Sequence, residues 1–174
     1  KGYVGTGRND DYVSTKDFWE YDPQTDAWTQ KADFAGGARR DAVGFSINDK
    51  GYMCTGLNDE LPYTRVDFWE YDPQTDDWTQ KADFAGEGRN IAVGFSINDK
   101  GYVGTGNISG QIGSYLGDDF WEYDPQTDAW TQKADLTGGA RRDAVGFSIN
   151  DKGYIGTGFF GGGNSSDLWE YLPN

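Results

Sequence analysis

One stretch of 18 residues, DFWEYDPQTDAWTQKADF, recurs through the chain at a spacing of about 50 residues. Full copies occupy residues 17–34, 67–84 and 119–136, and a shortened copy, DLWEY, occupies residues 167–171. The second and third full copies each differ from the first at one position. A fixed period of this size indicates a repeat architecture, in which each period is one supersecondary unit packed against its neighbours.

Each period reads as four short strands joined by tight turns. Residues 41–48 (DAVGFSIN) alternate large and small side chains, which predicts a strand whose small face lies very close to another element. In the NDKG turn that follows, Asn and Asp can bond their own backbone and Gly51 can take a positive φ. The remaining predicted elements of this period are strands at 51–56, 67–71 and 77–81 and a turn at 72–76 (DPQTD).

The hydrophobic pattern of these strands is two-sided. In the third strand of the period, Trp69 and Tyr71 share one face and Phe68 lies on the other. A flat sandwich would leave one face of each strand polar, whereas a propeller blade is covered on both faces by its neighbours. No stretch has a helical period. We therefore predict an all-β fold of four-stranded antiparallel blades, with the small-residue strand nearest the axis and the tryptophans on the outer strands.

The residues of each period resemble the kelch repeat. The matching features of one period are an arginine-containing turn at Arg39, the small-residue strand, Gly51-Tyr52 with Gly56, and the Y-D-P-x-T-x-x-W spacing from Tyr71 to Trp78. The resemblance covers essentially the whole chain and implies a kelch-type β-propeller. It departs from the family's Gly-Gly doublet, because each copy has Thr-Gly. The motifs GYxGTG and DFWEYDP resemble those of bacterial kelch proteins of the secreted or cell-surface type.

The strand pattern divides the chain into four units of a single domain spanning residues 1–174. These are a partial blade at 1–36, blades at 37–86 and 87–138, and a partial blade at 139–174, with three, four, four and three strands, 14 in all. Unpaired sheet edges at both ends would invite pairing with another chain. Two alternatives stay open: missing upstream blades complete the ring, or several chains assemble into a homo-oligomeric ring or fibre.

Composition excludes several classes of partner. Fifteen Lys and Arg face 29 Asp and Glu, for a formal charge of −14, and such a surface repels nucleic acid and anionic membranes. The sequence contains no run of about 20 apolar residues, so it predicts no membrane-spanning helix. The single cysteine, Cys54, excludes an internal disulfide. It stands where the other copies have glycine, so we expect a small buried residue and not a reactive thiol.

Catalytic and metal constellations are largely missing from the sequence. The chain has no histidine, so Ser–His–Asp and Cys–His arrangements and histidine-ligated metals are excluded, and with them a likeness to the copper oxidases that share the kelch architecture. The acidic pairs of the DPQTD turns could suggest acid–base chemistry or calcium, but repetition at identical positions favours turn-forming residues. We predict no catalytic residues, no metal site and no cofactor.

The loops between second and third strands differ between copies, while the strands and turns are nearly invariant within the chain. These loops span 8–16, 57–66, 107–118 and 159–166, and we expect them at the same end of the blades as the connections between fourth and first strands. Divergent loops on a rigid scaffold are a common place for recognition, although drift without function gives the same pattern. Candidate ligand-binding residues in them are Tyr12, Asn58, Tyr63, Asn107, Tyr115, Phe159 and Phe160.

The connections before each innermost strand carry a second candidate set. Its members are Arg39, Arg40, Arg89, Asn90, Arg141 and Arg142. We expect them at the mouth of the central channel, where guanidinium groups could hold a carboxylate or an acidic peptide, as in some kelch domains that this repeat resembles. The alternative is a structural pair with a neighbouring aspartate, for instance Asp41 or Asp143. The second copy has lost both the second arginine and that aspartate (Asn90, Ile91), which favours such a pair.

Three functions follow as hypotheses. The first is a non-catalytic binding propeller that recognises a protein, peptide or glycan through these loops, in an extracellular, cell-surface or periplasmic location. The second is a structural unit that assembles with further copies of itself. The third is an enzyme acting on acidic sugars, since some kelch propellers resemble sialic-acid isomerases. The lack of histidine places the third below the other two.

Overall fold

The computed structural model describes residues 1–110 and 113–173, and in this part of the chain the regular secondary structure is all β-strand. Residues 111–112, within the predicted loop 107–118, and Asn174, at the end of the predicted last blade, lie outside the described residues. The described part contains no helix that could cross a membrane. The strands are β1 (Gly2–Arg8), β2 (Ser14–Asp22), β3 (Ala27–Gln30), β4 (Val43–Ile47), β5 (Lys50–Cys54), β6 (Phe68–Asp72), β7 (Asp77–Lys81), β8 (Arg89–Asn90), β9 (Val93–Ile97), β10 (Lys100–Gly104), β11 (Asn107–Gly110), β12 (Gly113–Leu116), β13 (Phe120–Asp124), β14 (Ala129–Lys133), β15 (Val145–Ile149), β16 (Lys152–Gly156) and β17 (Leu168–Tyr171).

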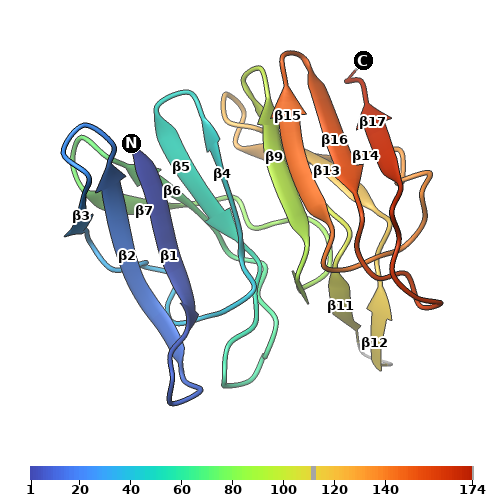
Figure 1. Ribbon diagram of the computed structural model, residues 1–174, viewed down its shortest axis with the longest axis horizontal. Coiled ribbons are helices and arrows are strands. Elements are labelled where there is room, and N and C mark those ends of the chain that lie inside the picture. Colours follow the sequence, from blue (N-terminus) through green and yellow to red (C-terminus); the bar gives the residue numbers. More distant parts are fainter. Residues whose placement is uncertain (111–112, 174) are drawn as a thin grey trace.

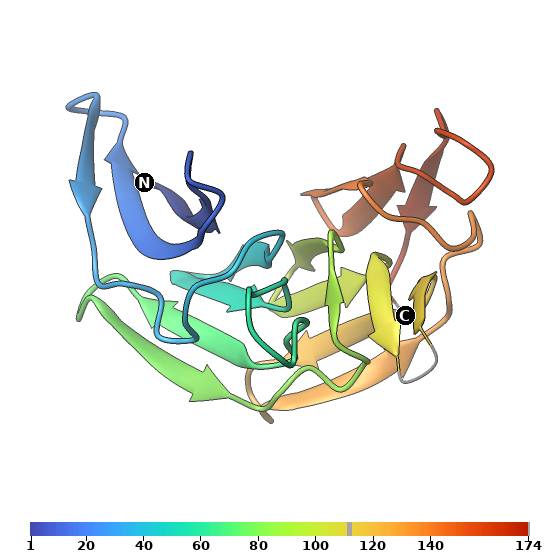
Figure 2. The ribbon, with the colours of Figure 1, turned by 90° about the horizontal axis from the view of Figure 1, so that it is seen from below.

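Four antiparallel sheets form the blades of a propeller arc (Figures 1 and 2). Two are complete, with strand orders β4-β5-β6-β7 and β9-β10-β13-β14. Two have three strands, β1-β2-β3 and β15-β16-β17, and they lie at the two ends of the arc (Figure 2). The predicted all-β propeller is confirmed, and its blades contain the 14 predicted strands.

The strands with small residues form the innermost layer, as predicted. β4 lies against β9, and β9 lies against β15. A Cβ atom added at Gly94 would collide with Val43 of the preceding blade, and one at Gly101 would collide with Phe45. The small face therefore exists to receive the large face of the neighbouring inner strand.

The same contacts correct the prediction for the NDKG turn. The positive φ belongs to Asn48 (52°) and not to Gly51, which already lies in β5. Asparagine tolerates this left-handed conformation better than most residues. The glycine is required at the corresponding positions of the next two blades, Gly101 and Gly153, because the preceding blade's phenylalanine ring packs there.

Aromatic contacts join successive blades farther from the axis. Phe68 of β6 meets Tyr123 and Trp130 of the next blade edge-on, at centroid distances of 4.6 and 5.0 Å. The sheet β1-β2-β3 joins the second blade in the same way, since Phe18 lies 4.8 Å from Tyr71. Such edge-to-face pairs add to the area that they bury. The predicted burial of both blade faces is thus correct.

Three short strands were not predicted from the sequence. β11 and β12 form a hairpin within the third variable loop, and β8 pairs with β11 in a small separate sheet. Figure 1 shows β11 and β12 projecting at the end of the molecule opposite the β4–β5 and β15–β16 turns. The structure therefore has 17 strands in its described part, three of which lie outside the blades.

The Thr-Gly doublets take the conformation that usually calls for two glycines. Thr55 and Gly56 have φ values of 61° and 96°, and Thr105 and Gly106 repeat them at 61° and 96°. A β-branched residue is strained in this region. The neighbouring Cys54 is fully buried, as predicted, and burial raises the pKa of its thiol to about 12.

Candidate functional site

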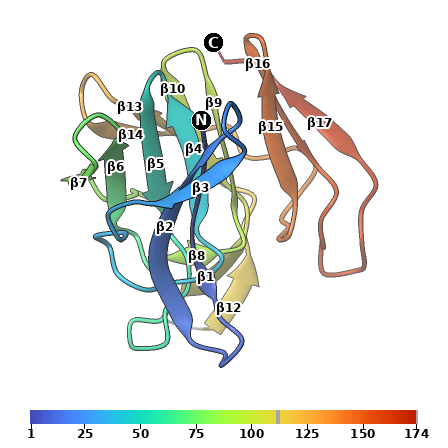
Figure 3. The ribbon, with the colours of Figure 1, turned by 60° about the vertical axis from the view of Figure 1, so that its left-hand side comes forward.

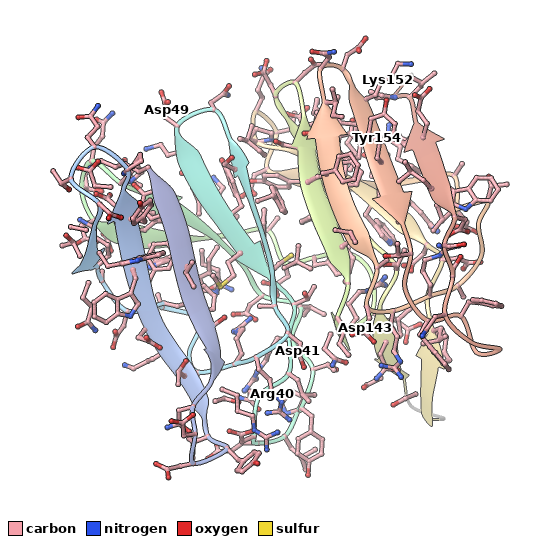
Figure 4. All side chains as sticks on the ribbon, viewed as in Figure 1. Arg40, Asp41, Asp49, Asp143, Lys152 and Tyr154 are labelled. Carbon is pink, nitrogen blue, oxygen red and sulfur yellow. The ribbon has the colours of Figure 1, made fainter. Side chains whose placement is uncertain are left out.

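The variable loops and the inter-blade connections lie at one end of the molecule. Figure 4 shows Arg40, Asp41 and Asp143 at this end, and Asp49 of the invariant turn at the other. Antiparallel strands of similar length produce this arrangement, because every second turn emerges on the same side. The predicted separation of variable loops from invariant turns is correct, and the loop end carries the candidate site residues.

The first arginine of each connection is buried inside the scaffold. The Arg39 guanidinium is 1% exposed and donates to both carboxylate oxygens of Asp67, at 2.9 and 2.7 Å. It also donates to the carbonyl oxygens of Thr55 (2.9 Å) and Gly36. Trp69 donates its Nε1–H to the same carboxylate at 2.7 Å. We call this arrangement an Arg–Asp clasp.

The clasp repeats at two further junctions. Arg89 pairs with Asp119 at 2.6 and 2.6 Å, and Arg141 pairs with Asp167 at 2.7 and 2.9 Å. A hydrogen bond from Arg141 holds the pKa of Asp167 far below its usual range. Burial would raise the pKa of Asp119, but hydrogen bonds and the charge of Arg89 outweigh it, and the net shift is downward.

These contacts correct the prediction for Arg39, Arg89 and Arg141. The three guanidinium groups are 1% exposed or less, and each has an internal carboxylate partner, so they do not line an open channel mouth. Their partners are also not Asp41 and Asp143, which the sequence suggested. The first aspartate of the DFWEY stretch fills that role instead, from 26 to 30 residues farther along the chain.

The second position of each connection behaves differently. Arg142 pairs with Asp143 at 2.6 Å and lies over the ring of Phe159, so the predicted pairing with the following aspartate holds there. Arg40 instead donates to Asp59 at 2.6 Å and to Ser14 at 3.0 Å. These side chains are partly exposed, at 37% and 21% for the two arginines.

A groove of about 400 Å³ lies between the second and third blades at the loop end. Its walls come from the connection before β4, the β5–β6 loop and the small sheet β8-β11-β12. Five of the predicted residues line it: Arg40, Asn58, Tyr63, Asn90 and Asn107. Four more line it that the sequence did not single out: Leu57, Asp59, Ser109 and Ser114. All four belong to the variable loops, but one leucine and three short polar side chains gave no signal of their own.

Most residues that line the groove have polar side chains, and the one cation among them, Arg40, is paired. Asp59 neutralises Arg40, so the pair presents hydrogen-bonding atoms and no net charge. Asn90 and Asn107 approach each other at 3.4 Å, and Asn90 approaches Asp41 at 3.4 Å. Both distances exceed the usual 2.7–3.2 Å of N–H···O bonds, so these amides retain capacity for a stronger partner. Tyr63 is 53% exposed and adds an aromatic surface.

The other predicted residues lie outside this groove. Tyr12 is 73% exposed in the first variable loop, with Arg8 over its ring. Tyr115 is exposed and donates its hydroxyl to Glu87 at 2.7 Å. Phe159 and the exposed Phe160 lie in the last variable loop, and the Phe159 ring lies under Arg142. The structure therefore brings together Asn58, Tyr63 and Asn107 of the loop candidates and leaves Tyr115 and the candidates of the two end sheets apart.

The repeated acidic pairs have structural partners. Asp72 accepts the backbone N–H of Gln74 at 2.8 Å, as a turn-forming residue should. Asp76 accepts the Tyr71 hydroxyl at 2.8 Å and the backbone N–H of Ala32, in the preceding blade, at 3.0 Å. The second aspartate of the pair thus links two blades, which the sequence did not reveal. Among residues 1–110 and 113–173, no group of three or more His, Cys, Asp or Glu could hold a metal ion.

The fold matches the solved structure of YjhT, a kelch-repeat β-propeller protein, with a TM-score of 0.75. The match covers 99% of this chain at 18% sequence identity, and at that identity it shows the fold alone. It covers 62% of the YjhT chain, so this chain spans less than two thirds of the length of the protein it matches. The sequence matches no protein-family model, and no curated protein matches it.

Proposed function

We propose that this kelch-type propeller is a non-catalytic binding module whose ligand occupies the groove between its second and third blades. One observation carries the proposal. Five side chains predicted as ligand-binding line a single groove, although they lie up to 67 residues apart in the sequence. They are Arg40, Asn58, Tyr63, Asn90 and Asn107. They come from the segments in which the copies differ, and divergent loops around a concavity on a rigid scaffold are where ligands are commonly bound.

The chemistry of the groove favours an uncharged polar ligand, and a glycan chain fits best. Hydroxyl groups of a sugar can donate and accept, which suits the Asn90 and Asn107 amides and the Ser109 and Ser114 hydroxyls. An acidic peptide would need a guanidinium without a partner, whereas Arg40 is bound by Asp59 at 2.6 Å. The ring of Tyr63 offers an apolar surface for a sugar face.

Glycan and peptide arrays probed with the 174-residue protein test this assignment. The expected result is binding to neutral glycans with little dependence on salt, because no net charge in the groove is involved. Binding confined to acidic peptides, and weakened by salt, would contradict the assignment. An absence of any binding on both arrays would favour a scaffold role over recognition.

We further propose that the protein works outside the cytoplasm, in the manner of a bacterial secreted or cell-surface kelch protein. This location is supported by the GYxGTG and DFWEYDP motifs and by the acidic composition, with a formal charge of −14. Fractionation of the native host, with an antibody against the exposed first variable loop, would place the protein. Recovery in the cytosolic fraction alone would contradict this location.

A further inference from the structure

One residue that lines the groove is more deeply buried than the rest. Asn90 is 5% exposed, whereas the other lining residues are partly or largely exposed. It belongs to β8, where it lies directly opposite Asn107 of β11. Figure 3 shows β8 and β12 of this small sheet at the loop end, opposite the β15–β16 turn. Backbone pairing therefore holds the two asparagines side by side, and both line the groove.

The equivalent pairs in the connections before β4 and β15 have different chemistry. Arg40 lies opposite Leu57, and Arg142 lies opposite Phe159, each through an isolated antiparallel bridge. In both pairs a cation faces an apolar side chain, and the Arg142 guanidinium lies 4.9 Å from the centre of the Phe159 ring. The connection before β9 differs at both members of the pair, so that two uncharged amides face each other there.

The residue after Asn90 differs as well. Asp143 follows Arg142 and pairs with it at 2.6 Å, whereas Ile91 follows Asn90 and has no group that could form such a pair. Ile91 has a φ of 57°, a left-handed conformation that is strained for a β-branched residue and that aspartate tolerates better. Backbone strain of this kind is concentrated at functional sites. The Asn90 amide is thus left to the groove and to the side chains across it.

The chemistry of the neighbours fixes the direction of these amides. A carboxylate only accepts hydrogen bonds, so Asn90 must present its Nδ2 to Asp41, at 3.4 Å. Its Oδ1 then faces Asn107, which contributes its own Nδ2 at 3.4 Å. The Oδ1 of Asn107 remains as an acceptor, and each amide has a second N–H to donate. A hydroxyl group both donates and accepts and suits this set, whereas a carboxylate has no proton to donate to the Asn107 Oδ1.

We propose that the Asn90–Asn107 pair is the selectivity element of the groove and binds an uncharged sugar hydroxyl in preference to a sugar carboxylate. Asp41 is a positioning residue, because it sets the direction of the amides without lining the groove. Its negative charge also disfavours an anion beside the pair. The inference rests on the proposed glycan-binding function and names the chemical group of the glycan that the groove distinguishes.

Matched sugars test this selectivity. Immobilised neutral oligosaccharides that end in a hexose are compared with counterparts that end in the corresponding hexuronic acid, in which a carboxylate replaces the hydroxymethyl group. The wild-type protein should bind a hexose member of the panel at least tenfold more tightly than its hexuronic acid counterpart. Asn90→Arg with Asn107→Leu, which copies the Arg40–Leu57 pair, should weaken hexose binding tenfold or more and remove the preference.

The last junction supplies the matched control. Arg142→Asn with Phe159→Asn makes the reverse exchange in a pair that does not line the groove, and it should change neither affinity. Circular dichroism checks that each variant folds. If the exchange of both asparagines prevents folding, Asn107→Leu alone changes one partly exposed side chain and should also weaken hexose binding tenfold or more.

Asp41→Asn tests the positioning role. Asparagine tolerates the left-handed conformation of residue 41, at φ 56°, so the variant should fold. It should reduce the hexose preference at least threefold, because an asparagine side chain can offer Asn90 either an acceptor or a donor and carries no charge. Asp143→Asn, at the same φ and outside the groove, should leave the preference unchanged.

The outcomes separate the two proposals. A wild-type protein that binds no member of the panel overturns the proposed function, and this inference with it. Two results overturn the inference alone: binding of the hexuronic acid partner as tight as that of the hexose, or a hexose preference that survives Asn90→Arg with Asn107→Leu. A preference that is unchanged in Asp41→Asn overturns the positioning role.

Discussion

Two neighbouring residues, Arg39 and Arg40, lie in environments with opposite consequences. Arg39 is 1% exposed and is held by Asp67 and two backbone carbonyl groups inside the scaffold. Arg40 is partly exposed on the wall of the groove, paired with Asp59 from a variable loop. The first position is arginine in all three connections, while the second is arginine, asparagine and arginine. Constancy within the chain thus marks the clasps, and variation marks the groove.

The difference shows why identical charge does not imply identical role. A guanidinium group removed from water needs partners for its charge and its donors, and the chain supplies the same carboxylate at every junction. A guanidinium group at the surface can exchange its partner for water or a ligand at little cost. Substitutions at the two positions should therefore separate stability from binding.

The largest effect is expected from breaking a clasp. Arg89→Ala leaves the Asp119 carboxylate without its cation in a largely buried place, and we expect a loss of about 3–5 kcal/mol in the free energy of unfolding. Arg142→Ala, at the partly exposed second position, is the matched control and should cost no more than about 1 kcal/mol. Urea unfolding measures both. Equal losses for the two variants would remove the distinction between the positions.

A smaller effect is expected at the strained Thr-Gly doublet of the scaffold. Thr105 has φ 61° and is fully buried, and its hydroxyl has no hydrogen-bond partner among the described residues. Glycine in a strand ordinarily makes a protein less stable than alanine does. At positive φ, however, alanine carries about 1–2 kcal/mol of strain that glycine lacks. Thr105→Gly should therefore unfold at higher urea than Thr105→Ala. The ordinary order, with alanine the more stable, would show that the strain has been relieved elsewhere.

Acid should weaken the Arg141–Asp167 clasp of the last sheet, whose carboxylate is partly exposed. The pKa of Asp167 in the folded protein lies below its ordinary 3.8, so the unfolded chain binds its proton first as the pH falls. The stabilisation is complete above about pH 4 to 5 and is lost as the pH falls through the lowered folded value. Because the carboxylate is 32% exposed, we expect roughly 1 kcal/mol or less. The stability difference between the wild type and Asp167→Asn, followed from pH 7 to pH 2.5, should shrink, and a constant difference would contradict this.

The smallest stability effect is expected in the groove. Tyr63 is exposed and Asn107 makes only a long 3.4 Å contact, so Tyr63→Ala with Asn107→Ala should change the free energy of unfolding by about 0.5 kcal/mol or less. Thermal unfolding of the double variant checks this. A loss comparable to that of Arg89→Ala would mean that these side chains serve the fold.

The sequence predicted the scaffold well because its signals are local and repeated. The alternation in residues 41–48 and the DPQTD turn indicate strands and turns without knowledge of distant contacts. The partner of Arg39 is different, because Asp67 is 28 residues away and Asp41 is next but one. Sequence proximity favoured the wrong aspartate, since only the blade geometry shows that the DFWEY stretch begins beside the arginine of the preceding connection.

For a related reason, the sequence predicted some residues of the groove but not the groove itself. Differences between copies pointed to Asn58 and Asn107, but not to which loops would meet. The hairpin β11–β12 decides that, and its residues 107–116 carry no strand alternation strong enough to predict it. Ser109 and Ser114 reach the groove only because this hairpin projects beside the β5–β6 loop.

Glycan binding by matched variants tests most directly whether recognition resides in the groove. Tyr63→Ala with Asn107→Ala removes one phenol and one amide from it, and Tyr12→Ala with Gln126→Ala removes the same groups from exposed positions outside it. For a neutral glycan selected on the array, calorimetry should show an affinity loss of about tenfold or more for the first pair and none for the second. Equal affinities for both double variants, each as tight as the wild type, would contradict the assignment of binding to this groove.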